Sequence, residues 1–178
     1  MKNDMQKILI TSDEIAVRVK EMAKVINEDY KGEEIVFVCI LRGSCYFYTD
    51  LTRLIDNVIY LEFMSASSYA GTSSTGEVRI TSDLSMPIEN KNVIIVEDII
   101  DTGYTLSYLK RILSERRPKS LKICSLLDKP SRRKVEIQGD YVGFTVPDEF
   151  VVGYGLDYNQ KYRNFPHIGV LKPSVYEK

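Results

Sequence analysis

The chain has 178 residues, of which 44% are hydrophobic and 28% are charged, and its formal net charge is −1. This composition excludes an intrinsically disordered or low-complexity protein, and the length is enough for one domain with a full core. A charge so close to zero provides no global basic field of the kind that nucleic-acid-binding domains carry.

Targeting signals and cysteine usage bear on the compartment. The N-terminal segment MKNDMQKILITSDE lacks the apolar core of a signal peptide, and no apolar run approaches the ~20 residues of a membrane helix. Cys39, Cys45 and Cys124 have no CxxC spacing, and their odd number indicates free thiols in a reducing compartment. We therefore expect a soluble, cytoplasmic protein with no membrane partner. The only histidine, His167, excludes a multi-histidine metal site.

The first third of the chain alternates helix and strand patterns. Residues 11–14 (TSDE) have the form of a helix capping box, and apolar residues at helical spacing follow until Gly32. Residues 35–41 (IVFVCIL) are a continuous apolar run, typical of a strand buried on both faces of a parallel sheet. A short turn then leads to a second helical pattern that ends near Ile55, and residues 58–64 predict another strand.

The rest of the chain continues this alternation. Ser65–Gly76 is uncharged and rich in serine, threonine and glycine, which predicts a loop. Alternating residues at 77–81 predict a strand with one wet face. Asn92–Val96 and Leu121–Leu127 are buried-strand patterns that enclose a helix between them. Shorter strands are expected at residues 141–146, 150–154 and 168–171.

This order of elements predicts an α/β fold. Strand–helix–strand alternation with apolar strands forms a twisted, mostly parallel sheet flanked by helices. No repeat or Pro/Gly-rich linker divides the chain, so we expect a single domain over residues 1–178. Ligands on such sheets bind beyond the carboxyl ends of the strands. Four polar groups follow predicted strands there: Arg42-Gly43, Glu97-Asp98, Asp101-Thr102-Gly103 and Asp128-Lys129.

Residues 93–105, VIIVEDIIDTGYT, carry the strongest chemical signal. Their last five residues lie between a buried strand and a helix start, where unpaired backbone N–H groups attract anions. Thr102 and Thr105 add hydroxyl donors, and Gly103 allows the backbone to approach a ligand closely. This chemistry suits a phosphate monoester, although the missing GKS/T ending excludes a Walker A loop. From these five residues alone, a plain side-chain helix cap is the preferred interpretation.

Glu97 and Asp98 shift this balance towards a ligand site. Two adjacent carboxylates are costly to desolvate unless hydroxyls or a cation meet them, and sugar hydroxyls and hydrated Mg²⁺ are natural partners. Because adjacent strand residues point to opposite faces, we do not expect the pair to form a simple two-acid clamp. Solvated acids at a loop edge remain the alternative.

The whole stretch resembles the phosphoribosyl-diphosphate (PRPP) binding motif of type I phosphoribosyltransferases: four hydrophobic residues, two acids, a variable pair and a D-T-G-x-T loop. Other segments resemble hypoxanthine-guanine phosphoribosyltransferases within that family. Ile40–Ser44 is similar to their pyrophosphate loop, and Ser67-Ser68-Tyr69 lies in a loop like their mobile flap. Leu127-Asp128-Lys129 and residues 147–164 (PDEFVVGYGLDYNQKYRN) are similar to their purine-binding and C-terminal active-site segments.

The resemblance implies a purine salvage enzyme with Mg²⁺ as cofactor, which converts PRPP and hypoxanthine or guanine to IMP or GMP and pyrophosphate. It implies Asp101 as the catalytic acceptor of the purine N7 proton, with Ser68 and Tyr69 of the flap over the reaction centre. The resemblance assigns the 5′-phosphate to Asp101, Thr102, Gly103, Tyr104 and Thr105. It assigns the ribose and the metal to Glu97 and Asp98, with Asp157 as a further metal residue, and the pyrophosphate to Leu41, Arg42, Gly43 and Arg163. The residues implied for the purine are Ile99, Lys129, Phe150, Val151, Leu156 and Asp157.

The resemblance further implies a small hood made by the N- and C-terminal segments, a flap at about residues 65–76, and a homodimer or homotetramer. A lysine donor at Lys129 facing O6 of the base would reject adenine, whose 6-amino group is itself a donor. Many family members have Lys-Gly-Gly where this chain has Arg42-Gly43-Ser44, so side-chain detail differs there while backbone contact is retained.

Other interpretations stay open at this point. Without the family, Lys129 is a surface charge and Phe150 a core aromatic. Some proteins of this fold are RNA-binding regulators, and the basic runs at 116–119 and 132–134 could contact RNA, although solvated loops are the simpler interpretation of both runs. A catalytically idle scaffold is disfavoured because every expected catalytic position is filled.

Overall fold

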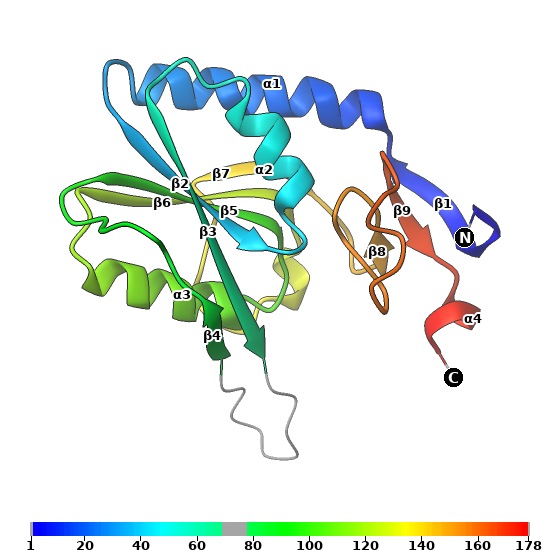
Figure 1. Cartoon of the computed structure of the whole chain (residues 1–178). Helices are drawn as coiled ribbons and strands as arrows, with labels where there is room; N and C mark the ends of the chain where they lie inside the picture. The colour runs from blue at the N-terminus through cyan, green and yellow to red at the C-terminus, as the bar shows by residue number, and fades with distance from the viewer. Residues whose placement is uncertain (1, 69–77, 178) are drawn as a thin grey trace.

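The computed structural model describes residues 2–68 and 78–177, with the side chains of Lys2, Ser67 and Ser68 excepted. Helices and strands alternate along most of the chain (Figure 1). The elements are β1 (Met5–Ile10), α1 (Ser12–Asp29), β2 (Ile35–Leu41), α2 (Cys45–Thr52), β3 (Ile59–Ser68), β4 (Val78–Ser82), β5 (Asn92–Ile100), α3 (Tyr104–Glu115), β6 (Ser120–Asp128), β7 (Tyr141–Thr145), β8 (Val151–Val152), β9 (Ile168–Leu171) and α4 (Pro173–Tyr176), with 3₁₀ turns at Lys2–Asp4 and Pro130–Arg132.

The main sheet has the strand order β4-β3-β2-β5-β6-β7. Strands β3, β2, β5, β6 and β7 are parallel, and only β4 runs antiparallel, against β3. Helices α1 and α2 cover one face of this sheet, and α3 covers the other (Figure 1). The predicted α/β fold with a mostly parallel, helix-flanked sheet is therefore confirmed.

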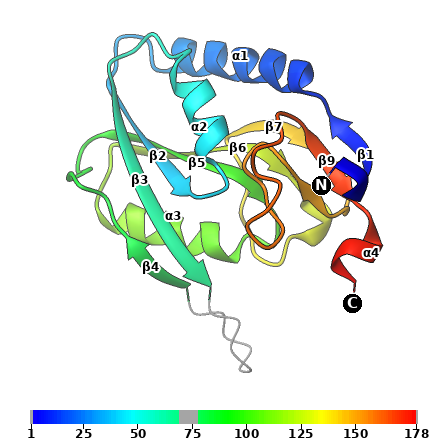
Figure 2. The ribbon, with the colours of Figure 1, turned by 45° about the vertical axis from the view of Figure 1, so that its right-hand side comes forward.

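A second, antiparallel sheet, β1-β9-β8, forms a hood at one end of the main sheet. It brings the two ends of the chain together, because β1 lies near the N-terminus and β9 leads directly into α4 (Figure 2). Lys172 N–H donates to the carbonyl of Asp4 at 2.9 Å, which ties the start of α4 to the N-terminal turn. The hood is thus closed by both terminal segments.

Side-chain alternation along β2 explains why helices cover both faces of the main sheet. Phe37 and Cys39 are fully buried in the cluster that includes residues of α1 and α2, whereas Val36 and Val38 are buried in the cluster that includes Leu109 of α3. Successive residues of a strand point to opposite faces, so a continuous apolar run needs cover on both sides. Each fully buried aliphatic side chain of this kind contributes ~1.5–3 kcal/mol.

Helix α1 also protects an exposed sheet edge. Its capping box forms as predicted, with Thr11 N–H donating to Glu14 Oε2 at 2.8 Å and Glu14 N–H donating to Thr11 Oγ1 at 3.3 Å. One turn further on, Arg18 donates to the carbonyls of Val142 and Gly143 in β7, both at 2.8 Å. Because an edge strand with unpaired carbonyls invites pairing with other chains, this guanidinium blocks the edge.

Several predicted boundaries were wrong. Strand β5 does not end at Val96 but continues to Ile100, because β6 pairs with it as far as Ile100↔Asp128. Strand β3 extends to Ser68, paired with Val78 of β4, so the first four residues of the predicted flap are strand. Tyr69 and the remainder of the flap lie outside the described residues.

The other differences concern short elements. The second helix ends at Thr52 rather than near Ile55, and the strand expected at 150–154 is limited to two residues. Strand β1 was not predicted as a strand, because the apolar residues of MQKILI do not alternate with the polar ones and its partner, β9, is distant in sequence.

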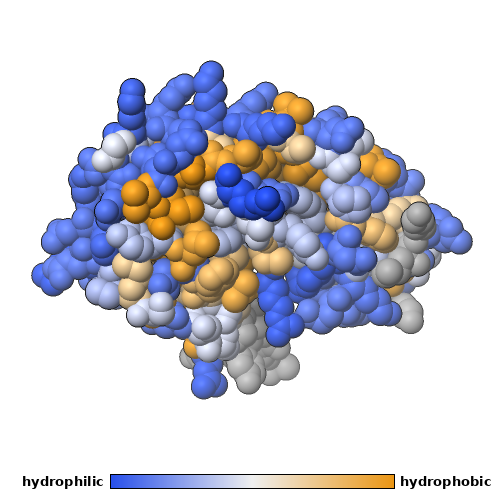
Figure 3. Space-filling model, turned by 45° about the horizontal axis from the view of Figure 1, so that its top comes forward, coloured by the Kyte–Doolittle hydropathy of each residue, from blue (hydrophilic) through white to orange (hydrophobic). Residues whose placement is uncertain are grey.

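The surface on the α1 side is mainly hydrophilic, with apolar side chains gathered in small patches (Figure 3). Val17 and Val25 of α1 are among the exposed large hydrophobic residues, at 58% and 47% exposure. No helix within residues 2–68 and 78–177 is both long and apolar enough to cross a membrane.

Candidate functional site

Two adjoining cavities lie at the carboxyl ends of the parallel strands. The first, of about 330 Å³, is lined by Ile40, Leu41, Arg42, Gly43, Ala66, Glu97, Asp98, Ile99, Ile100, Asp101, Thr102, Gly103, Thr105, Leu106, Asp157 and Arg163. The second, of about 320 Å³, is lined by Ile99, Asp101, Lys129, Arg132, Asp148, Glu149, Phe150, Val151, Leu156 and Tyr176. Ile99 and Asp101 belong to both walls. The two cavities therefore meet at Asp101.

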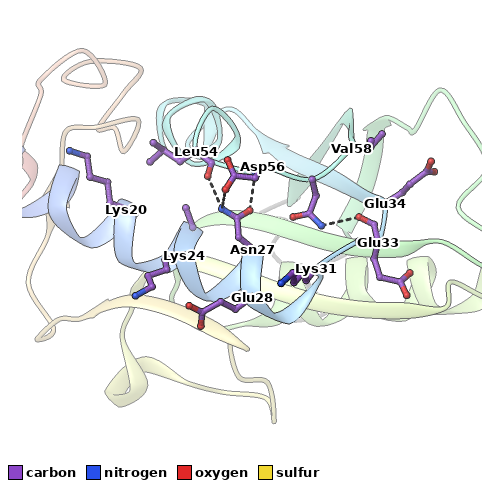
Figure 4. Close-up of a pocket in the computed structure, with 13 residues that line it drawn as sticks. Lys20, Lys24, Asn27, Glu28, Lys31, Glu33, Glu34, Leu54, Asp56 and Val58 are labelled. Atoms are coloured by element: carbon purple, nitrogen blue, oxygen red, sulfur yellow. Dashed lines mark hydrogen bonds between the residues drawn. The ribbon is translucent and has the colours of Figure 1, made fainter.

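A larger hollow of about 880 Å³ lies at the opposite end of β2, between α1 and the segment that follows α2 (Figure 4). Its wall mixes positive and negative groups such as Lys24 and Glu28. One of its amides, Asn27, donates to the carbonyl of Leu54 at 3.0 Å and to Asp56 Oδ2 at 3.3 Å. It contains none of the predicted site residues, so we assign it no function.

Glu97 and Asp98 both line the first cavity. The expectation that these neighbours would face opposite sides was wrong in this respect. Pairing between β2 and β5 ends at Cys39↔Val96, so beyond Val96 the side of β5 that faces β2 borders open space. Asp98 Oδ1 also accepts a hydrogen bond from the N–H of Ile99 at 2.7 Å, which turns its carboxylate along the strand. Both acids thus reach the same space.

Burial makes this acidic pair reluctant to ionise. Burial raises the pKa of Glu97 well above its ordinary value, and the neighbouring charge of Asp98 raises it further. Burial also raises the pKa of Asp98, while hydrogen bonds and the charge of Arg163 oppose that shift. Both acids are partly buried and lie within β5, so they are not solvated acids at a loop edge. An arriving cation or a set of hydroxyl donors would relieve the cost of ionisation.

The loop after β2 packs directly on this pair. A Cβ added to Gly43 would overlap Asp98 Oδ2, and a Cβ added to Gly155 would overlap the carbonyl oxygen of Gly43. Gly155 has φ +103°, a conformation that favours glycine. Ser44 is fully buried and donates to the carbonyl of Ile40, and the peptide bond between Leu41 and Arg42 is cis. The backbone of Arg42-Gly43 therefore forms the floor between Asp98 and Gly155.

The start of α3 provides a second polar wall. The N-cap of α3 is Gly103, with φ +86°, and no side chain caps the first turn. The alternative of a plain side-chain cap at Asp101 or Thr102 is therefore wrong. Thr102 and Thr105 line the first cavity, whereas the Tyr104 side chain is 55% exposed and lies outside both walls. An uncapped helix N-terminus beside two hydroxyls has the donors that a phosphate needs.

The second basic run holds this loop in place. Arg132 Nε lies 3.0 Å from Asp101 Oδ1, and Arg133 donates to the carbonyl of Asp101 at 2.6 Å while it pairs with Asp128. The N–H of Lys134 donates to the carbonyl of Thr102 at 3.0 Å. The interpretation of this run as a solvated loop was wrong for Arg133, whose side chain is only 16% exposed.

The first basic run behaves as expected for a solvated segment. Its cations pair with carboxylates on the surface: Arg116 with Asp83 at 2.7 Å, Arg117 with Glu89 at 2.8 Å and Lys119 with Glu33 at 2.8 Å. Exposed pairs of this kind contribute less than ~1 kcal/mol each.

Lys129 and Phe150 supply the second cavity with a buried cation and an accessible aromatic ring. Lys129 is only 6% exposed, and its Nζ donates to the carbonyl of Glu149 at 2.6 Å. Burial lowers its pKa, an effect that the charge of Asp101 opposes. Phe150 is 37% exposed, so its ring is accessible from the cavity side of the hood. The alternatives of a surface lysine and a core phenylalanine are both wrong. Val151 and Leu156, buried to 7% and 8% exposure, supply apolar wall.

Asp157 and Arg163 stand together on the wall of the first cavity. Arg163 Nη2 lies 2.7 Å from Asp157 Oδ1, and Arg163 Nη1 donates to the carbonyl of Gly155 at 2.7 Å. Asp157 Oδ2 accepts from the N–H of Gln160 at 2.7 Å. Asp157 was predicted at both the metal and the purine positions, but it does not line the second cavity. Its two oxygens are engaged by protein donors, which fits contact through water better than direct metal ligation.

The sequence reasoning missed four residues of the second wall: Arg132, Asp148, Glu149 and Tyr176. Asp148 and Glu149 lie in the segment Pro147–Asn164 that had been singled out, so their position could have been found. Tyr176 carried no signal, because only the tertiary structure brings α4 to Phe150.

The oxygen donors of Glu97 and Asp98 suit a hard cation such as Mg²⁺ only when a bound ligand supplies further oxygen donors. Within residues 2–68 and 78–177, no group of three or more His, Cys, Asp or Glu side chains could hold a metal ion. The Glu97–Asp98 pair is left with raised pKa values and oxygen donors that face a cavity. Mg²⁺ is typically held by one or two carboxylates together with substrate phosphates, so these residues fit it.

Comparisons with known proteins agree with this geometry. The protein-family model described as phosphoribosyl transferase domain matches residues 6–159 of the chain. The chain is 51% identical over 177 residues to hypoxanthine-guanine phosphoribosyltransferase of Staphylococcus aureus (strain Mu50), with 99% of each chain covered. A crystal structure of a hypoxanthine phosphoribosyltransferase from S. aureus superimposes with a TM-score of 0.96 at 50% identity, covering 100% of this chain and 97% of that one.

A longer relative matches as well. The chain is 49% identical over 179 residues to the bifunctional protein TilS/HprT of Listeria monocytogenes (strain F2365), which covers 100% of this chain. The chain spans about 28% of the length of that relative.

Proposed function

Because the chain belongs to the phosphoribosyltransferase family, and within it to the hypoxanthine-guanine phosphoribosyltransferases, we propose that it transfers the phosphoribosyl group of PRPP to N9 of hypoxanthine or guanine in a Mg²⁺-dependent reaction. The products are IMP or GMP and pyrophosphate. One observation carries this proposal: the anion-binding cavity and the cavity of Lys129 and Phe150 meet at Asp101.

The first cavity takes PRPP. The 5′-phosphate binds at the uncapped N-terminus of α3 with the Thr102 and Thr105 hydroxyls. The ribose hydroxyls face Glu97 and Asp98. Because the two acids meet hydroxyls and not the phosphate, they do not repel the phosphate. The pyrophosphate lies on the Arg42-Gly43 backbone, where Arg163 supplies positive charge.

The acidic pair also holds the cation. Glu97 and Asp98 would hold Mg²⁺ beside the bound substrate, and Asp157 would contribute through water. When bound, Mg²⁺ neutralises the charge that builds on the departing pyrophosphate. The raised pKa values of the two acids support this assignment, because a cation supplies the counter-charge that they lack.

The second cavity takes the purine. Lys129 Nζ donates to O6 of the base, and Phe150 stacks on the ring. Val151 offers its backbone to the N1 and 2-amino edge, while Ile99 and Leu156 pack on the apolar ring. A buried lysine donor selects a 6-oxopurine, because a 6-amino group would face it as a second donor and leave both unpaired.

Asp101 connects the two halves of the reaction. Arg132 bonds its Oδ1, and we assign Oδ2 to the N7 proton of the base. When N9 bonds to C1′ and the C1′–pyrophosphate bond breaks, the purine becomes cationic, and an acceptor at N7 stabilises that charge. The flap residues Ser68 and Tyr69 would exclude water from the reaction centre, an assignment that rests on family resemblance alone.

Steady-state kinetics with PRPP, Mg²⁺ and each of hypoxanthine, guanine, xanthine and adenine test the proposal. We expect turnover with at least one 6-oxopurine and none with adenine. Absence of PRPP-dependent turnover with every 6-oxopurine contradicts it.

The Asp101→Asn variant tests the role of its carboxylate. General acid–base contributions are typically 10²–10⁴-fold, so kcat should fall by about that factor while KM for PRPP changes little. Asp83→Asn, which removes a surface carboxylate paired with Arg116, is the matched control and should retain wild-type kcat. An unchanged kcat for Asp101→Asn would remove the proton-acceptor role.

RNA binding, the second function considered from the sequence, gains no support from the basic runs. Their arginines pair with carboxylates of the same chain, so little of their charge is left for phosphates. A filter-binding titration with RNA over a range of salt concentrations tests it. A steep decrease of affinity with salt would indicate several phosphate contacts and would favour this function.

A further inference from the structure

The ring of Phe150 is held by aromatic partners of its own chain. The Tyr176 ring stacks on Phe150 with a centroid distance of 4.7 Å and an interplanar angle of 22°, and Tyr158 meets the same ring edge-on at 5.6 Å and 89°. Offset stacks at this distance are favourable beyond the apolar area that they bury. Tyr176 also lines the second cavity beside Phe150.

The position of Tyr176 is fixed by the hood. Val175 and Tyr176 pack on the buried cluster of Val152, Tyr162 and Leu171. The helix that carries them is tied at its start, because Lys172 donates to the Asp4 carbonyl through its N–H at 2.9 Å and to the Asn3 carbonyl through its Nζ at 2.7 Å. Phe150 is tied to the end of β9, just before this helix, because its carbonyl accepts a hydrogen bond from the N–H of Leu171 at 3.0 Å.

We propose that Tyr176 is a positioning residue for the purine: it supports one face of Phe150, so that base, Phe150 and Tyr176 form a three-ring stack. Apart from the edge-on contact with Tyr158, Phe150 lies on a short loop next to a two-residue strand, and the residue is 37% exposed. Prior stacking lowers the entropy cost of ordering that ring when the base arrives. The C-terminal helix thereby sets affinity for the base and not for PRPP. This inference rests on the proposed function.

The test compares Tyr176→Ala with Tyr176→Phe in full steady-state kinetics. Loss of one aromatic stack should raise KM for hypoxanthine roughly three- to tenfold in Tyr176→Ala. KM for PRPP should stay within about twofold, because the first cavity does not include Tyr176. Tyr176→Phe keeps the ring and should retain the wild-type KM for both substrates.

A second stacked pair in the hood supplies the matched control. Phe165 and His167 stack at 5.4 Å and 10°, and neither lines the two cavities. His167→Ala removes this stack and should leave KM for hypoxanthine unchanged. If it raises that KM as much as Tyr176→Ala does, general loosening of the hood explains the effect and the proposal is overturned.

Fluorescence gives a readout independent of turnover. The chain has no tryptophan, so Tyr176→Trp introduces a single indole against Phe150. Its emission should change on addition of IMP and not on addition of inorganic pyrophosphate. An unchanged or lowered KM for hypoxanthine in Tyr176→Ala overturns the three-ring stack; a lowered KM would mean that Tyr176 competes with the base. If the wild-type chain itself has no turnover, the proposed function fails instead.

Discussion

The two cavities that meet at Asp101 are built in opposite ways. The first is formed mainly by consecutive residues at two strand ends, with the backbone of Gly43 pressed against Asp98 and Gly155. The second is formed by side chains from segments around Lys129, Phe150 and Tyr176, which only the hood brings together. Under the proposed function, phosphate and pyrophosphate would be held largely by backbone groups in the first cavity, whereas selection of the base would depend on side chains of the second.

The largest expected effect comes from Gly43→Ala in the first cavity. The added Cβ would displace the Asp98 carboxylate, and a shift of about 1 Å in such a group can cost ~10² in rate. We therefore expect kcat/KM for PRPP to fall by at least ~100-fold. The unfolding midpoint should change little, because the atoms that move are the end of a flexible side chain.

Gly32→Ala separates this effect from a general glycine effect. Gly32 has φ +79° and nothing within 4 Å of an added Cβ, so this variant should lose stability and keep activity. A Gly43→Ala enzyme with wild-type kcat/KM would show that the close contact with Asp98 has no role in the reaction.

A smaller and selective effect is expected from Lys129→Met in the second cavity. A charge-assisted hydrogen bond contributes ~1.5–3 kcal/mol, so KM for hypoxanthine should rise roughly 10- to 100-fold while KM for PRPP stays nearly constant. Lys24→Met, at the hollow on the opposite end of the molecule, should alter neither constant. An equal rise of both KM values in Lys129→Met would mean that the two cavities are not separate in function.

The smallest effect concerns stability and arises from the acidic pair. Because the pKa of Glu97 is raised in the folded state, the stability contribution of its neutral form is fully present below its unfolded pKa of ~4.3 and is lost as the pH rises through the folded pKa. Glu97→Gln should therefore raise the unfolding midpoint of the metal-free protein at pH 7. A gain of ~1 kcal/mol corresponds to ~2–4 °C for a domain of this size.

Thermal unfolding from pH 4 to pH 8 checks the direction of this change in the unfolding midpoint. The advantage of Glu97→Gln should vanish near pH 4, and the exposed Glu115→Gln, whose side chain is 64% exposed, should show no such trend. A lower midpoint for Glu97→Gln at every pH would contradict the account of an uncompensated acidic pair.

The contrast between a cavity built from consecutive residues and one built from distant segments explains what the sequence could predict. The apolar runs of β2, β5 and β6 predict buried parallel strands, and the motif at 93–105 places Glu97, Asp98 and the loop that precedes α3, because both signals are local. The side-by-side use of Glu97 and Asp98 was not predictable, since it depends on where β2 stops pairing with β5.

Long-range contacts account for the remaining misses. The role of Arg133 beneath Asp101 depends on a salt bridge to Asp128, and the stack of Tyr176 on Phe150 depends on the hood. Neither leaves a periodic or compositional trace in the sequence. The extension of β3 to Ser68 likewise depends on its antiparallel partner β4, so a serine-rich segment with the composition of a loop forms strand.

A crystal structure with IMP and Mg²⁺ would decide whether the two cavities form one site, because one nucleotide must span both. We predict the base within hydrogen-bond distance of Lys129 Nζ and stacked on Phe150, the ribose beside Glu97 and Asp98, and the phosphate at the N-terminus of α3. A nucleotide bound with its phosphate away from Thr102 and Thr105, or in the hollow at the opposite end of β2, would contradict it.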